Sequence, residues 1–279
     1  MSPFRRRTSP ATTISWAWRL ANERRDSAIL PTLLNALHLP SIGRNWKQIA
    51  ETADREGWPA AKTLATLVEI EVADRAARRI QRHRAESGLP AGKTFAGFDF
   101  DAAPGVRKAQ LLNLAEDVGW IDAGANLLVF GQSGTGKSHV VAAIGSALID
   151  AGRRVLFAST TDIVQKLQAA RRELSLPAAL DKLDKYHLLV LDDLSYVRKD
   201  QAETGVLFEL IAHRYERHSI AITANQVFSD WDQIFPQPAM TVAAIDRLVH
   251  HATIIEMNGQ SYRKRAAAAR VTAGGASDN

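Results

Sequence analysis

The chain has 279 residues, a formal net charge of +5, 46% hydrophobic residues and no cysteine. The absence of cysteine excludes disulfides and thiolate metal sites, and the longest apolar runs have only the length of a strand, so we expect neither a disulfide framework nor a membrane partner. The basic start lacks an apolar segment behind it, which argues against a secretory signal and favours a cytoplasmic protein, and the positive charge permits an anionic partner such as nucleic acid.

The N-terminal third is predicted to be helical. Residues 1–13 are basic, contain Ser, Thr and Pro, and lack periodicity, which predicts a disordered arm. Residues 14–88 carry apolar side chains at helical spacing and are interpreted as a helical domain for DNA binding and self-association. Its last element is a long helix over 60–86. The apolar face of that helix is predicted to comprise Leu64, Leu67, Val68 and Val72.

Beyond a linker expected at 89–104, strands and helices alternate. The strands are short and apolar on both faces, which is typical of a parallel sheet covered by helices on both sides. We therefore predict an α/β domain over 105–265 and a disordered tail over 266–279. Strands are expected near 126–130, 154–158, 188–192, 220–223 and 253–256, and helices near 137–151, 162–173, 202–217 and 242–250.

A phosphate-binding loop follows the first predicted strand. The run Gly131-Gln132-Ser133-Gly134-Thr135-Gly136-Lys137-Ser138 fits G-x-x-x-x-G-K-[ST], in which backbone N–H groups surround phosphates. Lys137 is expected to reach the β/γ-phosphates and Ser138 to ligate Mg²⁺, with the adjoining His139 included among the nucleotide-binding residues. The alternative is a chance glycine-rich loop, but the strand before it and the helix after it favour nucleotide binding.

Two carboxylates follow the third predicted strand. Leu188-Leu189-Val190-Leu191 leads directly into Asp192 and Asp193. Because the carboxyl ends of parallel strands meet at one edge of a sheet, Asp192 is expected beside the phosphate loop, where it can hold Mg²⁺. Asp193 would orient the attacking water as a general base. The alternative is a strand that ends in turn-forming aspartates.

Two further residues are candidates for catalysis. Asn225 ends the fourth predicted strand and is expected to contact the γ-phosphate or the lytic water, although capping of the next turn is the alternative. Arg247 lies late in the last predicted helix, where its guanidinium would reach the γ-phosphate of a neighbouring subunit. The alternative is an ion pair within the chain or a solvated side chain, and Arg214 and Arg217 are competing candidates.

Four arginines, Arg75, Arg78, Arg79 and Arg82, share one face of the long helix at i, i+3, i+4 and i+7 spacing. No acidic residue lies between Arg75 and Arg84, so this face is a candidate for binding DNA phosphates without sequence preference. The alternatives are a solvated basic face and pairing with acids elsewhere in the fold. The tryptophans are interpreted as core residues, and four histidines are expected to lack the carboxylate neighbours of a metal site: His213, His218, His250 and His251.

Together these features resemble an AAA+ ATPase, more narrowly the IstB/DnaC group, from about Ala28 to Arg265. The linker before the ATPase core of IstB proteins is similar to Leu89-Pro90-Ala91-Gly92-Lys93-Thr94-Phe95 followed by Phe98-Asp99-Phe100. The helical leader, rich in Leu and Arg, is more similar to IstB than to DnaC. The C-terminal signatures of the family are similar to Asn225…Phe228-Ser229-Asp230-Trp231, Asp246-Arg247-Leu248-Val249-His250-His251 and Gly259-Gln260-Ser261-Tyr262-Arg263.

The resemblance implies an α/β AAA+ P-loop ATPase with a five-stranded parallel sheet flanked by helices, a small helical domain before it and no C-terminal lid. It implies ATP and Mg²⁺ as cofactors, and an ATP-dependent homo-oligomer that assembles on DNA and regulates the transposase of the same insertion element. By position, Arg247 matches the trans-acting arginine of the family and Arg263 a second nucleotide sensor. Three other functions are kept as alternatives: a DnaC-like helicase loader, a small-molecule phosphotransferase and a non-catalytic DNA-binding scaffold.

Overall fold

The computed structural model describes residues 27–103, 105–194, 201–225, 231 and 238–258. The chain divides into two compact units between Arg78 and Arg79, inside helix α3 (Ala60–Glu86). This division lies ahead of the segment 89–104 that was expected to link the domains. Among the described residues, no helix is both long and apolar enough to cross a lipid bilayer.

The N-terminal unit consists of helices, as predicted. Residues 27–36 are helical and precede α2 (Pro40–Glu56), and α3 begins after a left-handed turn at Gly57. Leu34, Ile42 and Ala53 are buried between these helices. The apolar face predicted for α3 is open instead. The exposed fractions of its side chains are 64% for Leu64, 52% for Val68 and 60% for Val72.

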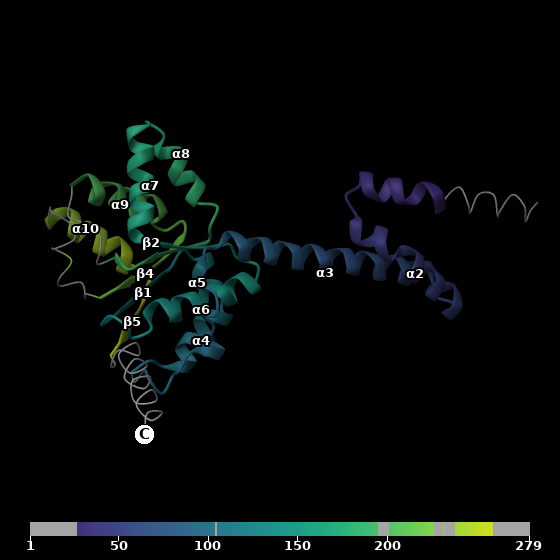
Figure 1. Cartoon of the computed structure of the whole chain (residues 1–279), viewed down its shortest axis with the longest axis horizontal. Coiled ribbons are helices and arrows are strands. Elements are labelled where there is room, and N and C mark those ends of the chain that lie inside the picture. Colours follow the sequence, from purple (N-terminus) through teal and green to yellow (C-terminus); the bar gives the residue numbers. More distant parts are fainter. Residues whose placement is uncertain (1–26, 104, 195–200, 226–230, 232–237, 259–279) are drawn as a thin grey trace, which may run out of the picture. The chain divides into compact units, whose positions relative to one another are not determined.

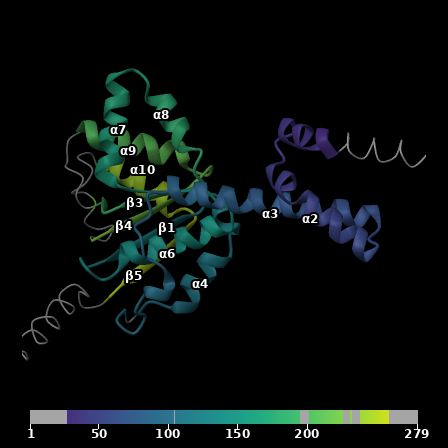
Figure 2. The same ribbon diagram turned by 45° about the vertical axis from the view of Figure 1, so that its right-hand side comes forward.

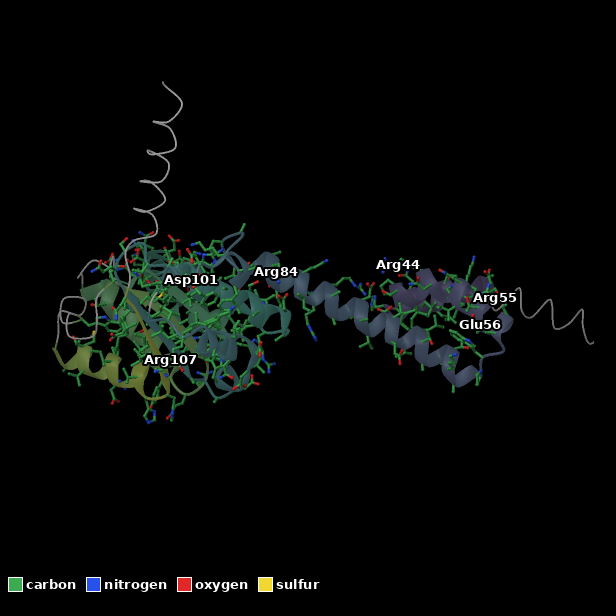
Figure 3. All side chains as sticks on the ribbon, turned by 90° about the horizontal axis from the view of Figure 1, so that it is seen from below. Arg44, Arg55, Glu56, Arg84, Asp101 and Arg107 are labelled. Atoms are coloured by element: carbon green, nitrogen blue, oxygen red, sulfur yellow. The ribbon has the colours of Figure 1, made fainter. Side chains whose placement is uncertain are left out.

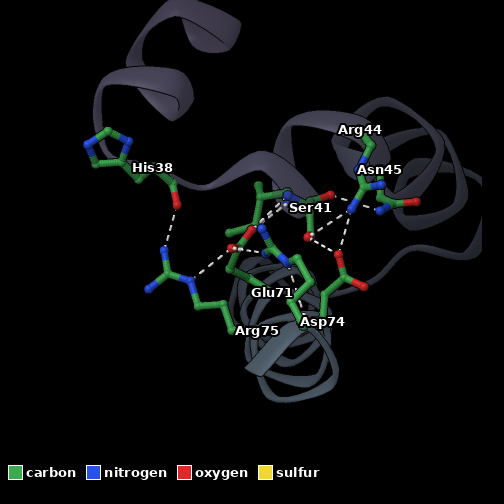
Figure 4. A network of polar contacts seen from close by, with 9 residues as sticks. His38, Ser41, Arg44, Asn45, Glu71, Asp74 and Arg75 are labelled. Atoms are coloured by element: carbon green, nitrogen blue, oxygen red, sulfur yellow. Dashed lines mark hydrogen bonds and ion pairs between the residues drawn. The ribbon is translucent and has the colours of Figure 1, made fainter. Parts of the chain in front are cut away.

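A buried carboxylate joins α2 to α3 (Figure 4). Glu71 accepts hydrogen bonds from the amides of Ser41 and Ile42, at 2.8 and 3.2 Å, and so satisfies free N–H groups at the start of α2. Arg75 donates to the same carboxylate at 2.9 Å. Burial opposes ionisation of Glu71, but the hydrogen bonds from Arg75 and from the two amides outweigh it and lower its pKa. The carboxylate of Asp74 accepts a hydrogen bond from the hydroxyl of Ser41 and forms an ion pair with Arg44.

The second unit is built on a five-stranded parallel sheet, which confirms the predicted fold class. Its order is β2-β3-β4-β1-β5, so β4 is central and lies between β3 and β1. The switch in strand order beside β1 opens a crevice at the carboxyl ends of the strands, where ligands bind in folds of this kind. All five expected strands are confirmed: β1 (Asn126–Gly131), β2 (Val155–Ser159), β3 (Leu188–Asp192), β4 (Ser219–Ala224) and β5 (Ala252–Met257).

Helices cover both faces of the sheet because alternate strand residues point to opposite sides (Figures 1 and 2). Leu127 and Val129 face α4 (Lys108–Glu116) and α6 (Lys137–Asp150), whereas Leu128 and Phe130 face the other layer. That second layer contains α7 (Thr160–Arg172), α8 (Leu176–Leu183), α9 (Gln201–Arg214) and α10 (Pro238–Val249). The helices α4, α5 (Gly119–Asp122) and α8 were not predicted.

The C-terminal end of α3 is fixed to the second unit. Ile80 packs against the core on the α6 side, and Arg84 (Figure 3) donates to Asp150 and Ser146 of α6. Directly after the helix, the carbonyl of Ser87 accepts a 2.7 Å hydrogen bond from the amide of Phe157. Phe157 lies in β2, an edge strand of the sheet. The residue after α3 therefore accepts a hydrogen bond from one of the backbone N–H groups on that edge of the sheet.

Candidate nucleotide-binding site

The phosphate loop connects β1 to α6 and needs glycine at its close contacts. Gly136, at φ 101°, precedes α6, and a Cβ atom there would lie 3.0 Å from the ring of Phe98. Gly131, at φ 149°, closely approaches the carbonyl of Met257, where a Cβ atom would overlap it. Any other residue at either position would therefore strain the backbone and crowd Met257 or Phe98.

Lys137 is the first residue of α6 and only 7% exposed. Its ammonium donates to the carbonyl oxygens of Gly131 and Gln132, at 2.7 and 3.0 Å, and to Oδ1 of Asn225 at 2.6 Å. These contacts hold the charge at the mouth of the loop and at the N-terminus of a helix, where an anion is stabilised. The structure thus brings the loop lysine together with the asparagine that follows β4.

The two aspartates lie at the end of β3, beside β4. Asp192 accepts a 2.6 Å hydrogen bond from the hydroxyl of Thr223, and the same hydroxyl accepts one of 2.9 Å from the amide of Asp193. Asp193 adopts a left-handed backbone conformation, φ 62°, which aspartate tolerates better than most residues. The sequence did not single out Thr223, although it is one of two polar residues, with Ser219, in the strand β4. It is 1% exposed and fixes both aspartates.

Asn225 connects the two halves of the site. While its Oδ1 accepts from Lys137, its Nδ2 lies 3.5 Å from Oδ1 of Asp193. This arrangement follows from the topology, because β4 pairs with both β1 and β3 and places Asn225 between the loop and the aspartates. A polar residue at this strand end therefore contacts both the phosphate loop and Asp193.

The site opens into a pocket of about 300 Å³. Residues 133–139 of the loop form one wall, and Asp193, Thr223 and Asn225 form another. The segment after α3 supplies a third wall through Lys93, Phe98 and their neighbours. His139 fixes this wall, since its Nε2 lies 2.8 Å from the carbonyl oxygen of Thr94 and its ring contacts Phe98.

Arg247 lies outside this pocket. Its Nη1 donates to the carbonyl of Ala243 at 2.8 Å, and its guanidinium lies over the ring of Phe208. It lines a shallow hollow on α10 together with Tyr215 and Asp246. Arg214, a competing candidate, is fully buried and donates to carbonyl oxygens, so it supports the fold. The other, Arg217, pairs with Asp184 at 3.0 Å, and Arg263 lies outside the described residues.

The arginine face of α3 is partly neutralised. Arg75 and Arg78 both pair with Glu71, at 2.9 and 3.4 Å. The alternative of pairing with acids elsewhere in the chain therefore holds for two of the four arginines, because Glu71 lies one turn before Arg75. Arg79 and Arg82 are exposed and make no ion pair with any described residue.

The structure tests two expectations, one about the burial of the tryptophans and one about the neighbours of the histidines. Trp231 is fully buried, as expected for a core residue, whereas Trp46 and Trp58 are only half-buried. The expectation that the histidines lack carboxylate neighbours was wrong: His213 lies 3.0 Å from Asp184, and His250 lies 3.6 Å from Glu216. Chain reversals after α9 and α10 produce the second contact, which sequence spacing does not reveal.

The residues present fit a nucleoside triphosphate and its metal ion. Residues 133–139, including Lys137 at the start of α6, line the pocket, and Gly131 and Gly136 allow the close approach of Met257 and Phe98 to the loop. Hydroxyl and carboxylate oxygens are the ligands that Mg²⁺ takes beside phosphates, and Ser138 and Asp192 supply this donor set. The parallel sheet, the loop and the strand-end acids define the chain as a AAA+ P-loop ATPase.

The family is shown by comparison with known proteins. Residues 32–269 match the family described as IstB-like ATP binding protein, and the chain belongs to it. An insertion sequence ATP-binding protein of Sinorhizobium fredii is 62% identical over 242 residues, which cover 87% of this chain and 81% of that protein. The corresponding protein of the insertion sequence IS5376 from Geobacillus stearothermophilus is 34% identical over 229 residues, or 82% and 91% of the two chains.

Solved structures of replication proteins share the fold. Domain III of the Thermotoga maritima replication initiation protein DnaA superimposes with a TM-score of 0.51 at 22% identity, covering 66% of this chain and 74% of that one. AMPPCP-bound DnaA from Aquifex aeolicus gives 0.50 at 19% identity, covering 62% and 51%. At these identities the likeness concerns the architecture of the ATPase unit.

Proposed function

We propose that this protein is the ATP-dependent DNA-binding partner of a transposase: it assembles on DNA as a homo-oligomer and assists target selection by the transposase of the same insertion element. The observation that carries the proposal is the joining of Lys137, Asn225 and Asp193 in one pocket of a chain whose relatives are ATP-binding proteins of insertion sequences. A nucleotide pocket linked to a polar strand end is suited to a switch between two assembly states. Cytoplasmic residence, where such DNA lies, is part of the proposal.

The pocket residues divide the work of ATP hydrolysis. Lys137 and the amides of the phosphate loop bind the phosphates, and Ser138 and Asp192 hold Mg²⁺. When bound, the ion neutralises charge on the phosphate oxygens. Asp193 accepts a proton from the attacking water, with its backbone fixed by the Thr223 hydroxyl. Asn225, in contact with Lys137 and Asp193, positions that water relative to the bound phosphate.

Arg247 completes the site of a neighbouring subunit in this proposal. Its place on α10, at a hollow outside its own pocket, supports a role in trans, because an arginine already inside the pocket would leave nothing for assembly to supply. Such an arginine stabilises charge that develops on the transferred phosphoryl group. Arg263 is kept as a candidate second sensor.

The N-terminal unit, with the start of the second unit, is proposed to contact DNA and to support self-association. Among the four arginines of the candidate face, Arg79 and Arg82 are the stronger candidates, since Glu71 neutralises part of the charge of Arg75 and Arg78. Their contacts would run to phosphates and would weaken with salt. DNA binding of this kind discriminates little between base sequences.

The test is to measure ATP turnover and particle size with and without duplex DNA, at two salt concentrations. We expect DNA to stimulate turnover and ATP to produce a large, salt-sensitive assembly. Lys137→Ala should abolish both responses, whereas Lys166→Ala, at an exposed lysine of α7, should leave them unchanged. Arg247→Ala should lower turnover only in the assembled state. A monomer whose turnover ignores DNA would contradict the proposal and favour a small phosphoryl acceptor.

A further inference from the structure

A cluster of metal-ligating side chains lies away from the ATP pocket, where the ends of α9 and α10 meet. Glu216 follows α9 and adopts a left-handed backbone conformation, φ 56°. His250 and His251 follow α10 and lead into β5. Each of the three offers one ligand atom, and these atoms all lie within 4.8 Å of one another. Nothing in the proposed ATPase mechanism uses them.

The backbone under this cluster is fixed by its own hydrogen bonds. The amide of His250 donates to the carbonyl of Asp246, and the carbonyl of His251 accepts from Asn126 at the start of β1, at 3.1 and 3.0 Å. The two imidazole rings lie 4.1 Å apart, centre to centre. A site whose backbone is already placed requires only side-chain rotation to bind an ion.

From this geometry we propose that Glu216, His250 and His251 form a binding site for a Zn²⁺-like transition-metal ion. Two imidazoles and one carboxylate are a donor set typical of zinc, whereas Mg²⁺ and Ca²⁺ prefer oxygen ligands throughout. Ligand atoms around tetrahedral zinc lie about 3.3 Å apart. Oε1 of Glu216 and Nδ1 of His250 are 3.6 Å apart, close to that value, and both side chains are half exposed and free to adjust.

A second cluster in the same unit shows why this one is the better candidate. Asp181, Asp184 and His213 also lie close together, but Asp184 is already paired with Arg214 and Arg217. A metal ion there would compete with two fixed positive charges. Glu216 makes no ion pair with an arginine or lysine among the described residues, so no fixed positive charge competes there, although its carboxylate also interacts with the Tyr215 hydroxyl.

Tyr215 determines how His250 can take part. Its hydroxyl lies 2.9 Å from Nδ1 of His250. Coordination through Nε2 preserves this hydrogen bond, which then orients the ring as an outer partner does in many zinc sites. Coordination through Nδ1 displaces it. Tyr215→Phe therefore separates the two modes: weaker binding in this variant indicates coordination through Nε2.

The experiment uses the full chain without an affinity tag, freed of metal with a chelator, and titrates ZnCl₂ by calorimetry and CoCl₂ by visible absorption. We expect one ion per chain and Co²⁺ absorption bands of a nitrogen- and oxygen-ligated site. His251→Ala and Glu216→Gln should each weaken binding at least about tenfold, whereas His213→Ala should not.

Each outcome of this experiment decides the proposal. Absence of saturable Zn²⁺ binding, or binding that His251→Ala and Glu216→Gln leave unchanged, overturns it. Binding that only His213→Ala removes assigns the ion to the Asp184 cluster and also overturns it. Because the readouts are affinity and absorption, the result is independent of whether the chain hydrolyses ATP or binds DNA. Circular dichroism of the variants shows that the fold is retained.

Discussion

Glu71 in the N-terminal unit and Lys137 in the ATPase unit are both charged and nearly buried, with exposed fractions of 2% and 7%. Glu71 lies in a closed network between two helices, where amides and arginines surround its carboxylate. Lys137 lies in an equally dense network, yet it also lines the pocket of about 300 Å³, together with Asn225 and Asp193. Burial of a charge therefore does not by itself mark a functional site. What distinguishes Lys137 from Glu71 is the adjoining cavity that its charge faces.

The largest effect that would test this contrast is expected at Asp193, the proposed general base. Asp193→Asn removes the proton acceptor while it keeps the size of the side chain, and we expect ATP turnover to fall about 10³-fold. Nucleotide affinity should change little, because the phosphate loop is intact. Steady-state turnover and a fluorescent-nucleotide titration measure the two quantities. Turnover within a few-fold of the unaltered protein would show that another group accepts the proton.

For Glu71, in its closed network, we expect the opposite pattern: a loss of stability without a loss of turnover. Glu71→Ala leaves the amides of Ser41 and Ile42 without their acceptor and should destabilise the packing of α2 on α3 by about 2 kcal/mol. Hydrogen exchange at the start of α2 reports this loss. Turnover without DNA should be unchanged. Glu69→Ala, an exposed acid on the same helix, is the matched control. If Glu71→Ala alters turnover without DNA and leaves exchange in α2 unchanged, the contrast fails.

A smaller effect is expected at Thr223, whose hydroxyl hydrogen-bonds to Asp192 and to the amide of Asp193. Thr223→Val keeps the shape of the side chain but removes the hydroxyl that holds Asp192 and the amide of Asp193. We expect about a tenfold loss of turnover, the size typical of residues that orient metal ligands. A raised Mg²⁺ requirement would distinguish this loss from simple destabilisation. Thr223→Ser retains the hydroxyl and should recover most of the activity.

The smallest effect is expected on the pH dependence of stability. The pKa values of Glu71 and Asp74 are lowered in the folded chain, so the stabilisation they provide is complete above their unfolded-state pKa values, near 4. That stabilisation is lost as the pH falls through the folded-state values. Urea unfolding of the full chain between pH 3 and pH 7 should therefore show α2 opening first in acid. Glu71→Gln should flatten this dependence, and an unchanged slope would show that Glu71 does not contribute.

Much of the ATPase unit was predictable because its strands are apolar on both faces and separate cleanly from helical segments. The strand assignment predicts that the residues after each strand lie at one edge of the sheet, because the carboxyl ends of parallel strands share an edge. These residues are the phosphate loop, Asp192, Asp193 and Asn225. The short helix α8 was not predictable, because eight residues hold too few turns to show a period. Thr223 was missed for a different reason: threonine is common in strands, and its role depends on which strand lies beside it.

The N-terminal unit was less predictable. Helical spacing predicted α3 but not what its apolar face contacts, and Leu64 and Val68 remain open to solvent. The pairing of Arg75 with Glu71 was visible in the sequence as an i, i+4 pair, one turn before the arginine run. The approach of Glu216 to His250 was not, because 34 positions of chain separate them and only the fold brings the two turns together.

The hydrogen bond from Phe157 to Ser87 bears on how the ATPase region should be isolated. An edge strand with free backbone donors is a template for intermolecular pairing and aggregation. Cutting the chain at residue 89, where the linker was expected, would remove Ser87 and Ile80 and uncover both the rim of β2 and a patch of the core. A fragment that begins at Arg79 keeps both covered. The end of α3 and the residue after it thus cover the edge of the sheet, and we expect a fragment that lacks them to aggregate more readily.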